Sequence, residues 1–241
     1  MMTIDERIAS YAKSFSVKGK SPLYSLNDRM YGDVSDEDDF QFELRGDFIA
    51  GALYKRKNNW YGSYPHSVIE RMYALFPDCM GSIFHMFSGS IPYHFPDQIT
   101  MDIKPSIDYG DIGSTEINHS VKPFINDDVR NIKKYTKLLM TRKIIFADPP
   151  YNNNHERYGT APVNKTQLLI DLEDCCKEGT FLCWLDSSVP IYNARTWHGY
   201  GRLTVYVGAN CMIRCWSILQ RTNYSFPKDE TRNELTKVNI E

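Results

Sequence analysis

The segment 148–151, Asp-Pro-Pro-Tyr, sets a carboxylate, two rigid prolines and an aromatic ring directly after the apolar run 144–147. Proline has no backbone N–H, so two prolines in a row end a strand. The apolar run therefore predicts a buried strand whose carboxyl end carries the acid and the ring. Ligands of open α/β sheets bind at the carboxyl ends of strands, so this segment marks a candidate site.

The elements that must position this segment follow from periodicity and capping patterns. Helical spacing and capping residues predict helices over 4–15, 65–76, 126–143 and 164–179. Apolar runs predict strands over 82–87, 98–103, 144–147, 180–185, 203–207 and 213–219. Such alternation favours a mostly parallel sheet with helices on both faces. Thr3 and Glu6 form a capping-box pattern at the start of the first helix. Asn126 is expected to cap the third helix and Gly179 to end the fourth.

Two connections carry further expectations. Only residues 208–212 separate the last two strands, which is too short for a parallel crossover, so these strands should form an antiparallel hairpin. Residues 16–60 show no clear pattern and are expected to be irregular. They include the acidic run 33–39, which is either a solvated loop or a loop that docks a partner.

Composition sets the class of protein. The 241 residues are 42% hydrophobic and 24% charged, which suits one large soluble domain or two small ones. No apolar run approaches the length of a membrane span, and the N-terminus lacks the order of a secretory signal. The six cysteines show no metal-ligand spacing, which favours a reduced, cytoplasmic protein with core thiols and no metal. A net charge of −2 means that any nucleic-acid surface must be a local patch.

The segment 148–151 resembles the catalytic motif of S-adenosylmethionine-dependent amino-methyltransferases, above all the DNA adenine-N6 enzymes of bacterial or phage-encoded type. Other segments resemble that family's landmarks in the same order over residues 60–221. The resemblance implies a Rossmann-like class I methyltransferase fold: an α/β sheet, mostly parallel, that ends in an antiparallel β-hairpin. It further implies a single methyltransferase domain over 1–241, with an N-terminal extension at 1–59 and a tail at 222–241.

The same resemblance assigns the S-adenosyl-L-methionine contacts. They are Tyr64 and Pro65 at the methionine end, His85, Phe87, Ser88 and Gly89 in the cofactor loop, Asp102 at the ribose hydroxyls beside Ile103, and Asp111 at the adenine. His85 stands where the family usually has an acid, so a structural or hydrogen-bonding role for His85 is the alternative. The short connection between the first two predicted strands implies a truncated crossover helix.

The chemistry implied is methyl transfer to an exocyclic amine, a poor nucleophile because its lone pair is delocalised into the base. The Asp148 carboxylate can accept one amine N–H, and the Pro149 carbonyl, directed by Pro150, can accept the other. These contacts favour a pyramidal nitrogen, and Asp148 takes the proton only late. Tyr151 can stack on a target adenine that has flipped out of the duplex.

Several polar residues are candidates for DNA contact. Amides can read base edges and arginine can bind phosphate, and basic residues beside aromatics suit a nucleic-acid surface. These residues are Asn152, Asn153, Arg157 and Tyr158 after the motif, and Lys133 and Lys137 on the predicted basic helix. A mobile polar loop and a solvated charged helix are the alternatives. Asp186 ends another predicted strand and could line the rim of the pocket or form a plain turn.

Two classes of function remain open. The first is a site-specific DNA adenine-N6 methyltransferase, within which RNA or cytosine-N4 methylation is the alternative. The second is a catalytically inactive, methyltransferase-like subunit that binds nucleic acid. No separate target-recognition region is evident, so specificity is relaxed, short, or supplied by a second subunit or a homodimer. The resemblance implies adenine rather than cytosine, because cytosine-N4 enzymes more often have Ser where this sequence has Asp148.

Overall fold

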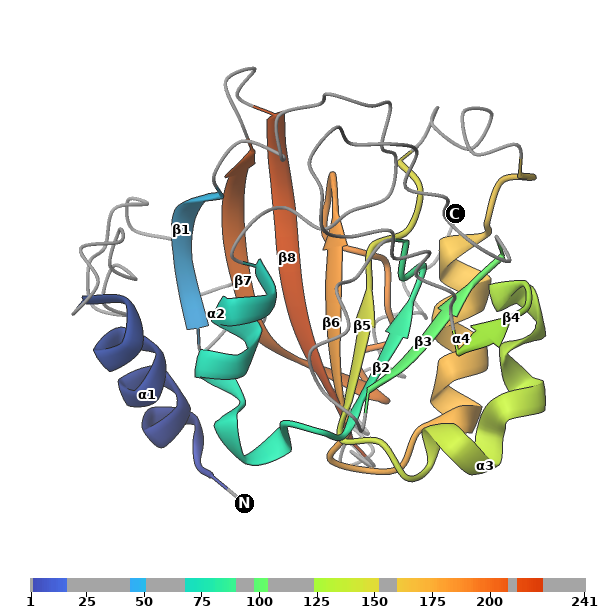
Figure 1. The fold of residues 1–241 in the computed structure, drawn as a ribbon, viewed down its shortest axis with the longest axis horizontal. Coiled ribbons are helices and arrows are strands. Elements are labelled where there is room, and N and C mark those ends of the chain that lie inside the picture. The colour runs from blue at the N-terminus through green and yellow to red at the C-terminus, as the bar shows by residue number, and fades with distance from the viewer. Residues whose placement is uncertain are drawn as a thin grey trace, which may run out of the picture.

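The computed structural model describes residues 2–16, 44–50, 68–89, 98–103, 124–151, 160–207 and 212–222. Within these residues an eight-stranded sheet has the order β1-β7-β8-β6-β5-β2-β3-β4 (Figure 1). The strands are β1 (Leu44–Ala50), β2 (Ile83–Met86), β3 (Ile99–Asp102), β4 (Ile125–Asn126), β5 (Ile144–Ala147), β6 (Phe181–Asp186), β7 (Trp197–Val207) and β8 (Met212–Arg221). The α-helices are α1 (Ile4–Ser16), α2 (Val68–Leu75), α3 (Thr136–Leu139) and α4 (Lys165–Cys175), and the 3-10 helices are η1 (Pro77–Cys79) and η2 (Val129–Tyr135).

The sheet is mixed but mostly parallel. Strand β8 runs antiparallel to both of its neighbours, β6 and β7, and the other described pairs run parallel. The expected mostly parallel α/β sheet and the antiparallel hairpin of β7 and β8 are therefore confirmed. Strand β7 begins at Trp197, earlier than expected, with a register irregularity between Gly199 and Gly201.

Strand β1 contradicts the expectation of irregular structure over 16–60. It pairs in parallel with β7, from Leu44 opposite Gly201 to Ala50 opposite Val207, and forms one edge of the sheet. Its sequence, LRGDFIA, places a glycine and two charged residues in seven positions, so it lacks the apolar run of a central strand. Pairing with a distant strand decides this element, and local sequence gives little sign of it.

The chain order creates a switch point between β2 and β5. From β2 the chain continues outward to β3 and β4, and then returns to form β5 on the other side of β2. The chain therefore leaves the carboxyl ends of β2 and β5 toward opposite sides of the sheet, and such a switch point is where ligands of open α/β sheets bind. The carboxyl ends of β5 and β6 point to the top of Figure 1, and the candidate site lies at this edge.

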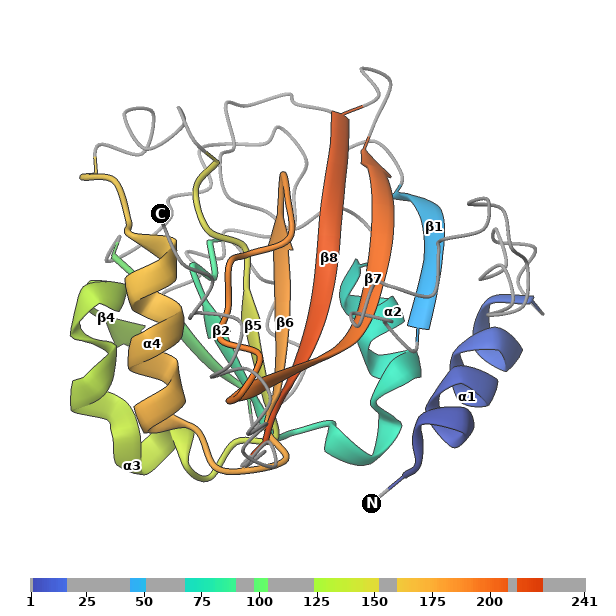
Figure 2. The same ribbon diagram turned by 180° about the vertical axis from the view of Figure 1, so that it is seen from behind.

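Two hydrophobic cores hold helices on opposite faces of the sheet. On one face Val68, Met72 and Leu75 of α2, with Tyr11 of α1, pack against side chains from β5 to β8. On the other face α4 contributes Leu168 and further leucines that pack against β2, β3 and β6 together with η2 and α3. Figure 1 shows α1 and α2 beside the β7–β8 hairpin. Figure 2 views the molecule from the opposite side and shows α3 and α4 on the other face of the sheet. Helices on both faces are thus confirmed.

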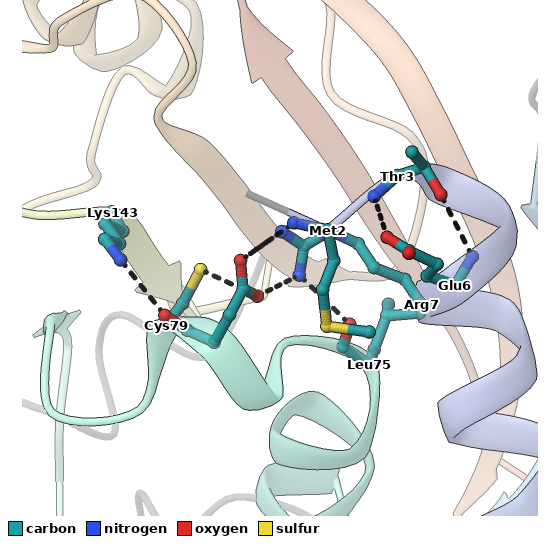
Figure 3. Close-up of polar contacts among 8 residues, drawn as sticks. Met2, Thr3, Glu6, Arg7, Leu75, Cys79 and Lys143 are labelled. Atoms are coloured by element: carbon teal, nitrogen blue, oxygen red, sulfur yellow. Dashed lines mark hydrogen bonds and ion pairs between the residues drawn. The ribbon is translucent and has the colours of Figure 1, made fainter.

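Helix α1 begins with the predicted capping box and is tied to the α2–η1 corner (Figure 3). Thr3 N donates to Glu6 Oε2 at 2.7 Å, and Glu6 N donates to Thr3 Oγ1 at 3.3 Å. The fully buried Arg7 donates to both carboxylate oxygens of Asp78, at 2.6 and 3.0 Å, and to the Leu75 carbonyl at 3.3 Å. The N-terminal helix is therefore an integral part of the sheet's first core.

Two predicted helices differ from the structure. Over 126–143 the helical part is η2 followed by the four-residue α3. Asn126 does not cap this helical part, because it belongs to β4 and pairs with Asp102 of β3. The cap of η2 is Asp128, whose side chain accepts a hydrogen bond from Arg130 N at 2.9 Å. The helix expected over 164–179 ends at Cys175, and the next residue, Cys176, has an extended backbone conformation. Gly179 lies beyond it, in a turn with φ of +84°.

The cysteines of the described residues behave as core thiols. Five of them are free and buried: Cys79, Cys175, Cys176, Cys183 and Cys215. The sixth cysteine of the sequence, Cys211, lies outside the described residues. None of the helices in the described part of the chain is long and apolar enough to cross a membrane.

Candidate functional site

The predicted motif lies at the carboxyl end of β5, as the sequence indicates. The side chain of Asp148, one residue past the strand, is 9% exposed, and Pro149 is buried. The Tyr151 hydroxyl donates a hydrogen bond to Asp148 Oδ1, so the two side chains lie together at the strand end. The carboxylate and the ring therefore form one unit at the switch point.

Arg214 of β8 completes this unit, and sequence reasoning missed it. Its Nη1 lies 3.7 Å from Asp148 Oδ2, and its Cζ lies 4.3 Å from the centroid of the Tyr151 ring. Strand β8 is antiparallel to β6, so the start of β8 lies at the same edge as the ends of β5 and β6. Arg214 is the only charged residue in the run 212–219, and an isolated charge in an apolar strand was the available signal.

A second ion pair lies at the end of β6. Lys165, the first residue of α4, places its Nζ 2.6 Å from Asp186 Oδ2. Asp186 is 3% exposed and also accepts from Trp184 Nε1 at 3.3 Å and from Ser187 N at 2.7 Å. The two carboxylates at this edge are thus matched by two cations. The place of Asp186 at the rim of a pocket stays a prediction.

Burial dominates the electrostatics of the motif. Burial raises the pKa of Asp148 from 3.8 to about 6, although the Arg214 charge and the Tyr151 hydrogen bond both act to lower that pKa. Burial and the Asp148 carboxylate raise the pKa of Tyr151 well above its usual value. At neutral pH Asp148 is therefore mostly ionised and Tyr151 is protonated, which is the combination that their hydrogen bond requires.

The loop after β2 lies next to this motif, because β2 and β5 are paired neighbours. Phe87 and Gly89 adopt left-handed backbone conformations, with φ of +53° and +49°. Ser88 N donates to the Met101 carbonyl at 3.0 Å, and Gly89 N donates to Asp102 Oδ2 at 2.8 Å. The glycine loop and the acid at the end of β3, to which the resemblance assigns the same cofactor, are thus in direct contact.

His85 lies inside β2 and is completely buried. Burial lowers its pKa to about 3, against a hydrogen bond with Gln98 that acts to raise it, and its ring lies 5.9 Å from that of Phe146. A neutral, buried imidazole held by Gln98 fits the hydrogen-bonding role given above as the alternative. Its assignment as a cofactor contact stays a prediction.

Of the remaining predicted residues, one lies at the same edge of the sheet, two lie on η2 and α3, and the others lie outside the described residues. Ile103 follows β3 and is 42% exposed. Lys133 of η2 pairs with Asp171 at 3.1 Å and Asp174 at 2.9 Å, so its charge is neutralised within the fold. Lys137 lies on α3, and its contact with DNA stays a prediction, as does that of Lys133. Outside the described residues lie Tyr64, Pro65, Asp111, Asn152, Asn153, Arg157, Tyr158 and the short crossover at 90–97.

The described residues contain no group of three or more His, Cys, Asp or Glu side chains that could hold a metal ion. No protein-family model matches this chain, and no curated protein matches it in sequence. The geometry of the motif and its neighbours therefore carries the functional inference.

Proposed function

We propose that this protein is an S-adenosylmethionine-dependent methyltransferase that acts on the exocyclic amine of a nucleic-acid base, with adenine N6 of DNA as the first candidate. One observation carries the proposal. Asp148 and Tyr151 form a hydrogen-bonded unit at the carboxyl end of β5, and the neighbouring strand β2 ends in a glycine loop bonded to Asp102. A group-transfer enzyme needs a donor site and an acceptor site side by side, and the two strand ends provide adjacent positions for them.

The order of the strands supports a Rossmann-like methyltransferase fold. Strands β4-β3-β2-β5-β6 follow the 3-2-1-4-5 order of doubly wound nucleotide-binding sheets. The next position belongs to β8, which is antiparallel and forms a hairpin with β7. The resemblance implies a Rossmann-like methyltransferase sheet that ends in a reversed hairpin, and this sheet differs in that β1 adds one further strand, parallel to β7, beyond the hairpin.

The residues around the β2 loop fit a nucleoside cofactor. The Ser88 hydroxyl is buried and has no hydrogen-bond partner among the described residues, so a polar group of a ligand can satisfy it. The left-handed Gly89 lets the backbone approach a ligand closely. Asp102, at the end of β3, is the acid assigned to the ribose hydroxyls. S-adenosylmethionine would supply a methyl group that its sulfonium has already activated.

Within this proposal the motif holds the amine. A carboxylate offers about four lone-pair positions, so Asp148 can accept an amine N–H while it keeps the Tyr151 hydroxyl on Oδ1. The Pro149 carbonyl accepts the second N–H, which favours a pyramidal nitrogen with its lone pair directed at the methyl group. Asp148 stabilises the charge that develops on nitrogen and takes the proton late. Tyr151 stacks on the flipped base.

The first test uses the purified protein with tritiated S-adenosylmethionine and three substrates: unmethylated duplex DNA, the same DNA as single strands, and bulk RNA. Labelled nucleosides are identified after digestion. N6-methyladenine from DNA is the expected product. Label in N4-methylcytosine or in RNA would move the protein to the alternative substrates. No label in any substrate, together with no cofactor binding by calorimetry, would refute the proposal.

The matched variants are Asp148→Ala and Asp174→Ala. Asp148→Ala removes the acceptor of the amine, so methyl transfer should be lost while cofactor binding is kept. Asp174 is an exposed aspartate near the far end of α4, with a side chain 66% exposed, and it pairs with Lys133, so the same substitution there should leave cofactor binding unchanged and should not abolish transfer. Product formation by Asp148→Ala at the normal rate would contradict the role of Asp148. Cofactor binding without transfer by the unmodified protein would favour the inactive subunit.

A further inference from the structure

Arg214 occupies an unusual position for a cation. Its side chain is only 11% exposed, and its Nη1 is buried and makes no hydrogen bond among the described residues. The guanidinium lies over the Tyr151 ring, with Cζ 4.3 Å from the ring centroid, and 3.7 Å from Asp148 Oδ2. A buried cation without full hydrogen bonding costs free energy, so a role at the site accounts for its position better than a contribution to stability.

We propose that Arg214 is a positioning residue that keeps the Asp148 carboxylate ionised and holds the Tyr151 ring in place before the base enters. The proposal rests on the proposed methyl transfer and deepens it, because it names the group on which the acceptor function of Asp148 depends. Arg214 acts through Asp148 and Tyr151 and need not contact the substrate. Since it covers one face of the ring, the base stacks on the opposite face.

The charges around Asp148 single out Arg214. Tyr151 faces the carboxylate from the same loop, Asp186 from β6, Lys165 from α4 and Arg214 from β8. Asp186 and Lys165 have opposite effects on Asp148 and are paired with each other at 2.6 Å. Arg214 is therefore the cation that offsets the burial of Asp148. Without it, a rise of about one unit from a pKa of about 6 would leave the carboxyl about half protonated at pH 7, and a protonated carboxyl is a weaker acceptor for the amine.

The shape of the side chain matters as much as its charge. A planar guanidinium stacks on an aromatic face and carries its charge at any accessible pH, whereas the lysine ammonium is compact and strongly hydrated. Arg214→Lys should therefore keep Asp148 ionised but support the Tyr151 ring less well. Arg214→Met keeps the length of the side chain and removes the charge.

The test is the pH profile of methyl transfer for the unmodified protein, Arg214→Met and Arg214→Lys. Loss of an opposite charge within about 4 Å raises a carboxyl pKa by about one unit or more. From a starting pKa of about 6, a rise of about one unit lowers the ionised fraction at pH 6 by about fivefold and hardly changes it at pH 9. Arg214→Met should therefore move the acid limb upward and recover activity at pH 9, and Arg214→Lys should keep the limb in place. An equal loss of activity at every pH would refute the proposal.

A second measurement does not depend on activity. Urea unfolding at several pH values gives the free energy of unfolding with Asp148 and with Asp148→Asn, and the difference between the two is the stability gap. The gap is measured once with Arg214 present and once in the Arg214→Met variant. The stability gap grows between the unfolded and the folded pKa of Asp148, and it reaches half its full value midway between them. A rise of about one unit in the folded pKa should therefore raise this midpoint by about half a unit in Arg214→Met, and should raise the pH at which the gap stops growing by about one unit. If the unmodified protein transfers no methyl group at any pH but this midpoint rises, the proposed function fails and the Arg214–Asp148 coupling stands. An unchanged midpoint refutes the coupling. Arg214→Gln, also neutral, replaces Arg214→Met if that variant does not fold.

Discussion

Replacing Asp148 by asparagine should stabilise this protein, and the gain should depend on pH. Burial raises the pKa of Asp148 from 3.8 to about 6, so the folded state holds the proton more tightly than the unfolded state. A raised folded pKa contributes stability at low pH that is lost as the pH rises through about 6. A shift of about two units corresponds to about 3 kcal/mol. Asparagine has the same shape as the protonated acid and never ionises.

The expected gain of Asp148→Asn over aspartate is about 3 kcal/mol at pH 8 and about 1 kcal/mol at pH 4.5, apart from a constant offset between amide and acid. Urea unfolding at several pH values measures both terms. A gap that stays constant between these pH values, or that widens as the pH falls, would refute the argument, because it would mean that the buried carboxylate is not destabilising. The expected sign is that of a site where function costs stability.

Asp78→Asn is the matched control, because the sign there is opposite. Burial acts to raise the pKa of Asp78, but hydrogen bonds, chiefly from Arg7, outweigh it and lower that pKa to about 2. A depressed folded pKa contributes stability above pH 4 that is lost as the pH falls toward 2. The Asp78→Asn variant should therefore be less stable than the unmodified protein at pH 8, and the difference in their free energies of unfolding should narrow at low pH. A measurement in which both variants shift in the same direction would point to a general pH effect.

Three further stability changes can be measured by the same unfolding assay. Arg7→Met removes one partner of a buried ion pair and leaves the Asp78 carboxylate without its guanidinium, which should cost about 3 kcal/mol; a loss under 1 kcal/mol would mean that water replaces the contact. Thr3→Ala removes the cap of α1 and should cost about 1 kcal/mol, with no added cost if Glu6 is already alanine, since the two residues form one capping box. Gly179→Ala should cost about 1 kcal/mol from its φ of +84° alone, because an added Cβ would meet nothing within 4 Å; a larger loss would indicate a rearranged turn.

The features that the sequence determined by itself depend on neighbours along the chain. Two prolines after an apolar run end a strand wherever that strand packs, so the position of Asp148 at a strand end was predictable. The Thr3–Glu6 capping box involves residues three positions apart and formed as expected. The short connection after β7 allowed only a hairpin. In each case the backbone geometry restricts the outcome before any tertiary contact is made.

The tertiary structure alone decided which distant groups meet. Arg214 is 66 positions after Asp148 in the chain, and it reaches the site only because β8 is inserted antiparallel between β6 and β7. The same insertion order brings β1 to the edge beside β7, although its residues lack a strand pattern. The pKa of Asp148 also follows from tertiary burial, since the residue type alone gives the ordinary value of 3.8. Strand order and burial are properties of the whole sheet, and local sequence patterns do not contain them.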